Sequence, residues 1–207
     1  IRRYLLSIDA LPSKPLIAFV PMSLRTDNSV AGNQLSFVLA NLGTHLDDPL
    51  SRIELIHRSM NNGKRRFRRM NQAQVINYSV ISYAWEGINL ATGLFPKKQA
   101  FNLIISNVPG SEKPLYWNGA RLQSLYPASI VFNGQAMNIT LASYLDKIEF
   151  GITACSKALP HVQDMLVLIE EELQLLERTS KELEFQGITV EDKSSHKGNG
   201  KTKKLAP

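Results

Sequence analysis

The sequence predicts an α/β fold in which helices pack against a twisted sheet. Short apolar runs rich in β-branched residues alternate with turn-forming residues over much of the chain, which is typical of strands. Stretches after residue 47, after residue 73 and after Pro160 instead repeat their apolar residues at helical spacing. With 207 residues, 43% of them hydrophobic, the chain is long enough to bury a core.

The first half of the chain is expected to contain both element types. Apolar residues at helical spacing between Ile1 and Ile8 indicate a short helix. Residues 16–20 and 35–42 are strand candidates, and Pro21 is expected to end the first of them. Asp47-Asp48-Pro49 predicts a helix start, because acids and proline are favoured there. A second long helix is predicted for 73–91, apolar enough to face an interior or a lipid-like ligand.

Beyond Pro96 the apolar period changes to two, which indicates strands. We predict them at 101–106, 116–125, 136–144 and 147–154, followed by a helix that opens at Pro160. The first of these strands leads into Ser106-Asn107-Val108-Pro109-Gly110, where Pro109 removes a donor and Gly110 allows a turn that other residues resist. Such a strand end presents a hydroxyl and an amide to a cleft.

The charge distribution separates a near-neutral body from a basic tail. The net charge is +6, and five lysines with no acid occur between residues 193 and 204. We therefore predict a folded lobe over 1–180 and a basic, disordered tail over 181–207, with nucleic acid not expected as a partner. The lone Cys155 is typical of a reducing cytoplasm. The start at Ile1, inside a predicted helix, suggests a fragment of a longer protein.

Motifs for self-contained chemistry do not occur in the sequence. The chain has no Cys and His cluster for zinc, no H-E-x-x-H, no G-x-S-x-G and no glycine-rich dinucleotide fingerprint. These observations argue against a metal enzyme and a nicotinamide enzyme. A Ser-His-Asp set assembled only by folding stays open.

Several ordered motifs resemble one family. They are Val20-Pro21-Met22-Ser23-Leu24-Arg25, Gly32-Asn33, Asp48-Pro49-Leu50-Ser51-Arg52, Ser106-Asn107-Val108-Pro109-Gly110, Pro114-Leu115-Tyr116-Trp117-Asn118-Gly119-Ala120, Tyr126-Pro127-Ala128-Ser129 and Gly134-Gln135-Ala136-Met137-Asn138-Ile139-Thr140. Together they resemble, over about residues 1–177, the C-terminal half of bacterial wax ester synthase/diacylglycerol acyltransferases. The resemblance implies a chloramphenicol acetyltransferase-like lobe, an α/β fold with a mixed twisted sheet, facing a similar lobe across a tunnel.

The resemblance also implies a function. The family esterifies long-chain fatty alcohols or diacylglycerol with acyl-CoA to wax esters and triacylglycerol, and acyl-CoA is a substrate rather than a bound cofactor. Its catalytic H-H-x-x-x-D-G motif lies in the N-terminal half and does not occur here, so no catalytic residue is predicted in this chain and the chain alone is expected to be inactive. Implied partners are the N-terminal half and a peripheral membrane or lipid-droplet surface, with a cytoplasmic location at the inner membrane or lipid inclusions. The alternative is a non-catalytic lipid- or protein-binding module of the same fold.

Two sets of candidate site residues follow. Tunnel-lining candidates are Ser106, Asn107, Val108, Pro109, Gly110, Ser129, Asn138 and Thr140. Asn107 and nearby backbone amides are expected either to donate hydrogen bonds to the reacting thioester oxygen or to hold the turn. The other polar side chains are expected either to contact the substrate or to form hydrogen bonds with neighbouring backbone. The second set consists of basic residues that are candidates for binding CoA phosphates or anionic lipid headgroups: Lys64, Arg65, Arg66, Arg68 and Arg69. The alternative for them is a solvated helix end without a ligand.

Overall fold

A computed structural model describes residues 1–23, 35–70, 73–75, 77, 78, 80, 84, 88, 92, 99–132 and 134–185. The chain divides into two compact units, which we describe separately. The helical unit combines Ile1–Ala10 with the chain from Gln163 onward, and the sheet unit comprises Leu11–Val162. Most of the predicted tail lies outside the described residues, so the domain boundary at 180 stays a prediction. Much of the predicted helix 73–91 also lies outside them, and the positions described there are helical.

In the helical unit, α1 (Arg2–Ser7) and α4 (Asp164–Phe185) are joined by an ion pair. Arg3 Nη2 lies 2.6 Å from Glu171 Oε2. Tyr4 is 2% exposed, and its burial, followed by the negative charge of Asp164, raises the pKa of its phenol. The predicted helix start at Pro160 was wrong, because His161 has a φ of 54°, a left-handed conformation that a right-handed helix does not contain.

The sheet unit is built on a mixed five-stranded sheet in the order β2-β1-β3-β6-β7. Its strands are β1 (Ile17–Ser23), β2 (Leu35–Asn41), β3 (Leu103–Val108), β6 (Met137–Tyr144) and β7 (Lys147–Ala154). The β1–β3 and β3–β6 pairs are parallel, whereas the β1–β2 and β6–β7 pairs are antiparallel. Strands were therefore predicted correctly in all five places, although β1 and β3 continue beyond their predicted C-terminal ends.

Both differences follow from pairing. β1 continues through Pro21 to Ser23, because β3 pairs only with Ala18 and Phe19 and the proline interrupts no ladder on that side. β3 continues through Asn107 to Val108, because β6 stays in register with it as far as Ala142. The polar pair that we placed at the strand end thus lies within the strand, and Pro109 follows its last residue.

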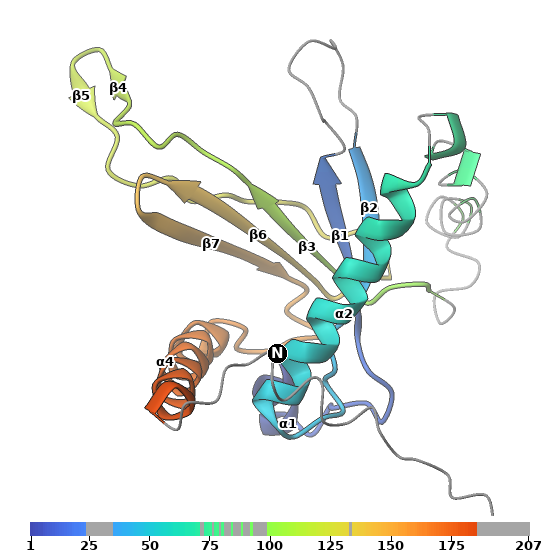
Figure 1. The fold of residues 1–207 in the computed structure, drawn as a ribbon. Coiled ribbons are helices and arrows are strands. Elements are labelled where there is room, and N and C mark those ends of the chain that lie inside the picture. Colours follow the sequence, from blue (N-terminus) through green and yellow to red (C-terminus); the bar gives the residue numbers. More distant parts are fainter. Residues whose placement is uncertain are drawn as a thin grey trace, which may run out of the picture. The chain divides into compact units, whose positions relative to one another are not determined.

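Helix α2 (Pro49–Arg68) packs along β2, which Figure 1 shows beside it. Its predicted start is confirmed: the Asp48 carboxylate accepts a hydrogen bond from the Ser51 amide at 2.9 Å. A Cβ at Gly63 would lie 2.4 Å from Cγ1 of Val38, so glycine allows the close approach of helix and sheet. Near the helix end, Phe67 packs with Val38 in a small buried cluster.

The predicted strand at 116–125 was wrong. The segment forms a tight hairpin of β4 (Tyr116–Trp117) and β5 (Ala120–Arg121), which Figure 1 shows standing out beyond the end of β6. Asn118 and Gly119 have φ values of 46° and 83°, and two central residues in the left-handed region are typical of a two-residue hairpin turn. Residues 122–132, which we call the crossing segment, have no regular secondary structure.

Candidate functional site

The register of β3 and β6 decides which predicted site residues lie together. Ser106 is aligned with Thr140, and Asn107 is aligned with Leu141. Since successive side chains of a strand point to opposite faces, Ser106, Asn138 and Thr140 share one face of the sheet and Asn107 lies on the other. The predicted tunnel-lining set is thus divided between two faces.

Four of the predicted residues, Ser106, Ser129, Asn138 and Thr140, form one hydrogen-bonded group that we call the hydroxyl cluster. Thr140 Oγ1 lies 2.7 Å from Ser129 Oγ and accepts a bond from Ser106 Oγ at 3.3 Å. It also lies 3.3 Å from Asn138 Oδ1, and Asn138 Nδ2 donates to the Ile130 carbonyl at 3.0 Å. Asn138 and Thr140 are buried, and such groups are costly to bury unless they are paired. The cluster therefore fastens Ser129 and Ile130 to β6.

Two further contacts hold the crossing segment on the same face. The Tyr144 hydroxyl donates to the Leu122 carbonyl at 3.0 Å, and a Cβ at Gly151 would lie only 1.7 Å from the Pro127 carbonyl oxygen. Gly151 thus permits backbone to approach backbone. The sequence analysis did not single out Tyr144 or Gly151, although alternation along β6 places Tyr144 on the face of Asn138 and Thr140.

The Pro109-Gly110 corner lies against the end of β6. The Gly110 amide donates to Ser143 Oγ at 3.1 Å, and a Cβ on Gly110 would lie 1.8 Å from the Ser143 carbonyl oxygen. Gly110 has no positive φ, so our expectation of an unusual turn geometry was wrong. Glycine is needed here because the backbone of β6 passes so close.

Asn107 is exposed, and Val108 beside it is 52% exposed. No hydrogen bond within the described residues uses the Asn107 side-chain amide, in contrast to the paired amide of Asn138. An amide that is exposed within the last two residues of β3 and bonded to no described residue is able to donate to a ligand.

The second candidate set lies near the end of α2. Residues 58–69, which we call the basic segment, contain six basic residues and no acid. Two adjacent grooves of about 690 and 490 Å³ adjoin it. The first groove is lined by Asn62, Arg65, Arg66, Arg69, Met70 and Gln74. The second groove is lined by Arg58, Asn61, Asn62, Lys64, Arg65 and Arg68. All five predicted cations therefore line a groove.

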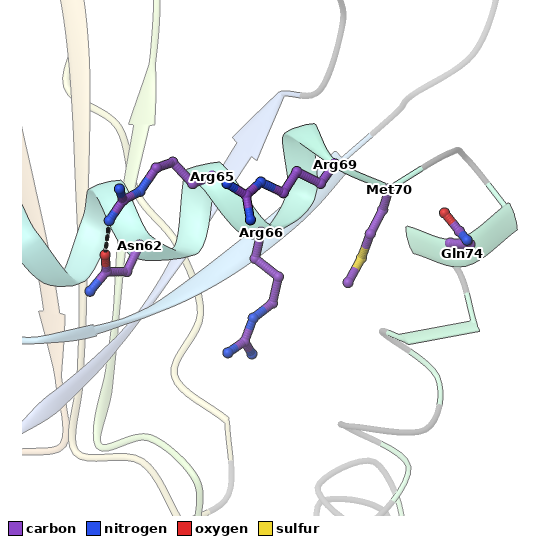
Figure 2. Close-up of a pocket in the computed structure, with 6 residues that line it drawn as sticks. All are labelled: Asn62, Arg65, Arg66, Arg69, Met70 and Gln74. Atoms are coloured by element: carbon purple, nitrogen blue, oxygen red, sulfur yellow. Dashed lines mark hydrogen bonds between the residues drawn. The ribbon is translucent and has the colours of Figure 1, made fainter.

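Local contacts orient two of these arginines. Figure 2 shows Arg65 folded back toward Asn62, to which it donates at 2.5 Å, while Arg66 leaves the helix in another direction. Arg66 Nη1 donates to the Tyr78 hydroxyl at 2.5 Å, and its guanidinium carbon lies 5.6 Å from the centre of that ring. Phe67 packs edge-on against the same ring. Arg66 therefore contacts the chain that follows α2.

The sequence analysis missed the groove residues Arg58, Asn61, Asn62, Met70 and Gln74. Helical spacing from Arg58 through Asn62 and Arg65 to Arg69 was the signal that would have found Arg58 and Asn62. Gln74 belongs to the next segment and reaches the groove only through the fold. Among the helices of the described residues, none is both long and apolar enough to cross a membrane.

Comparison with known proteins places these observations in a wider context. The sequence model described as the WS/DGAT C-terminal domain matches residues 31–177. The "O-acyltransferase WSD" of Acinetobacter baylyi is 58% identical over 177 residues, which are 86% of this chain and 39% of that protein. A putative diacylglycerol O-acyltransferase of Mycobacterium tuberculosis is 47% identical over 86% of this chain and 40% of its own length.

A solved structure agrees with these sequence matches. The wax ester synthase/diacylglycerol acyltransferase from Marinobacter aquaeolei matches with a TM-score of 0.77 and 42% identity, over 87% of this chain and 41% of that one. The predicted lobe with a mixed sheet is thereby confirmed. The chain spans about 40% of the length of the relatives that it matches.

Proposed function

The chain belongs to the wax ester synthase/diacylglycerol acyltransferase (WS/DGAT) C-terminal domain family, and on this premise we propose that it is the C-terminal part of an acyl-CoA-dependent O-acyltransferase. The observation that carries the proposal is the agreement of sequence and fold over 86–87% of the chain. The acceptors are long-chain fatty alcohols, diacylglycerol or both, and the products are wax esters and triacylglycerol.

The reaction needs a group that this chain does not supply. A histidine in the preceding part of the whole protein removes the proton of the acceptor hydroxyl, and the oxygen attacks the thioester carbonyl. A C–O bond forms, the C–S bond breaks, and the CoA thiolate takes up the proton. Between the attack and the breaking of the C–S bond, negative charge develops on the thioester carbonyl oxygen. A fixed hydrogen-bond donor at this oxygen therefore lowers the barrier by roughly 3 kcal/mol.

Asn107 is the candidate donor on this chain. Its exposure and its lack of a bonding partner among the described residues support a ligand contact rather than a turn-holding role. The side chains of the hydroxyl cluster bond to one another, and Asn138 and Thr140 are buried, which favours a positioning role for Ser106, Ser129, Asn138 and Thr140. Val108, Pro109 and Gly110 then shape the wall beside Asn107.

Large apolar side chains on the hairpin and the crossing segment support a further contact with the rest of the whole protein. Trp117, Tyr126 and Ile130 are 86%, 73% and 69% exposed. Exposed aromatic side chains of this size are typical of surfaces that a partner covers. The preceding lobe is the partner that we assign to them, since the relatives extend well beyond the matched region.

A chimera tests the proposed function. The chain replaces the matching region of the Acinetobacter baylyi O-acyltransferase, and transfer from palmitoyl-CoA to hexadecanol and to dioleoylglycerol is measured. We expect activity from the chimera and none from the chain alone. A folded but inactive chimera, beside an active parent, would favour the non-catalytic binding module.

Asn107→Ala in the same chimera tests the donor role. We expect kcat to fall about 100-fold while KM for acyl-CoA changes little, because the lost bond strengthens as the oxyanion forms. Ser106→Ala is the matched control, since it removes a neighbouring polar group on the other face of the sheet. If Asn107→Ala instead reduces the yield of folded protein and leaves kcat unchanged, Asn107 is a structural residue.

A further inference from the structure

The charge of the basic segment exceeds what its helix position requires. Cations near a helix C-terminus interact favourably with the helix dipole, but that effect is confined to the last turn. Arg58 lies more than two turns before the end of α2 at Arg68, and it lines the same groove as Arg68. Within the described residues, no ion pair involves any of the six cations. An anionic ligand is therefore the better explanation.

The shape and lining of the grooves favour compact phosphate groups over a lipid surface. The first groove combines arginines with the side-chain amides of Asn62 and Gln74, and neutral donors beside arginine suit phosphate oxygens. A lipid surface would require apolar side chains to insert beside the cations, yet among the described residues only Met70 adds an apolar side chain to either groove. Contact with Tyr78 fixes Arg66, which lowers the entropy lost when a ligand binds.

The two grooves are adjacent and share Asn62 and Arg65. A ligand that fills both must carry two phosphate-containing groups on one small framework. Acyl-CoA does so, with a 3′-phosphate and a 5′-diphosphate on one ribose. Resting on the acyl-CoA dependence proposed above, we propose that the basic segment binds the 3′-phosphoadenosine diphosphate part of acyl-CoA, with one phosphate-containing group in each groove.

Direct binding to the 207-residue chain tests this assignment without any measurement of activity. CoA, dephospho-CoA, which lacks the 3′-phosphate, and pantetheine, which lacks all phosphates, are titrated into the chain by calorimetry. A phosphate monoester carries nearly two negative charges, so we expect dephospho-CoA to bind about tenfold more weakly than CoA. Pantetheine is expected not to bind, and the affinity for CoA is expected to fall steeply with added salt.

Variants confined to one groove assign the two phosphate positions. Arg69→Gln alters the first groove alone and Arg58→Gln/Arg68→Gln the second alone, while Arg65 is kept because it lines both grooves and Arg66 because it contacts Tyr78. Each variant is expected to weaken CoA binding about 10- to 100-fold. Arg121→Gln/Lys147→Gln is the matched control. It removes two exposed charges from β5 and β7, and it is expected to leave CoA binding within about twofold, because neither strand is a neighbour of β2, against which α2 packs.

Three results would overturn the assignment. The first is equal affinity for CoA and dephospho-CoA, and the second is an equal loss of affinity in the control pair. The third is binding to phosphatidylglycerol vesicles that the groove variants abolish, with no binding of CoA, because it would identify a lipid surface as the ligand. Circular dichroism of each variant establishes that it is folded. An active chimera with no CoA binding at these grooves would reject this site and leave the proposed acyltransferase intact.

Discussion

Gly110→Ala probes a close approach between two backbone segments of the sheet unit. The new Cβ would lie 1.8 Å from the Ser143 carbonyl oxygen, whereas real Cβ atoms essentially never approach a neighbour within 3.0 Å. The corner must therefore move away from β6, which also breaks the 3.1 Å bond from the Gly110 amide to Ser143 Oγ. Overpacking costs about 1–3 kcal/mol and a lost hydrogen bond about 0.5–1.5 kcal/mol. We expect the free energy of unfolding to fall by about 2–4 kcal/mol.

Urea unfolding of the 207-residue chain, followed by far-ultraviolet circular dichroism, measures this loss. Ser143→Ala is the first control, since it removes only the hydrogen bond and should cost about 1 kcal/mol. Gly119→Ala is the second control. It also replaces a glycine, but no atom lies within 4 Å of the new Cβ, so only its φ of 83° is penalised, by about 1 kcal/mol. If Gly110→Ala is no less stable than Ser143→Ala, the close approach is not the reason for glycine at this position.

Two further predictions use the same unfolding measurement. Gly63→Ala should lower the free energy of unfolding by about 1–2 kcal/mol, because overpacking against Val38 outweighs the better helix propensity of alanine. In the Gly63→Ala background, Val38→Ala should lower the free energy of unfolding by less than it does in the parent chain, because it makes room for the new methyl group. Strictly additive losses would contradict the packing argument. Asp48→Ala should cost about 1 kcal/mol at pH 7 through the lost cap. Hydrogen bonds from Ser51 lower the pKa of Asp48 in the folded chain, so the cap stabilises the fold fully above the pKa of the unfolded carboxyl group. The difference in the free energy of unfolding between the parent chain and Asp48→Ala should therefore shrink below about pH 4. A difference that stays constant with pH would exclude the cap as its cause.

Local chemistry made several elements readable from the sequence. Asp48 and Pro49 mark the start of α2 because an acceptor and a residue without an N–H suit the free amides there. Alternating apolar residues identified β6 and β7, since successive side chains of a strand point to opposite faces of its sheet. The family was readable as well, because its motifs are contiguous in the chain.

Features that depend on distant residues were not readable. The pairing of β3 with β6 extended the strand through Asn107 and divided the candidate residues between two faces. Gly110 gave no sign in the sequence that its neighbour would be the carbonyl oxygen of Ser143, and Gln74 gave none that it would line a groove with Arg69.

By itself, then, the sequence determined the places of the five main strands, the start of α2, the family and the presence of two sets of polar and basic candidates. Only the tertiary structure decided which candidates meet. The physical reason is that turn chemistry and apolar periodicity act between residues a few positions apart, whereas register and close backbone approach join residues about thirty positions apart, such as Ser106 and Thr140.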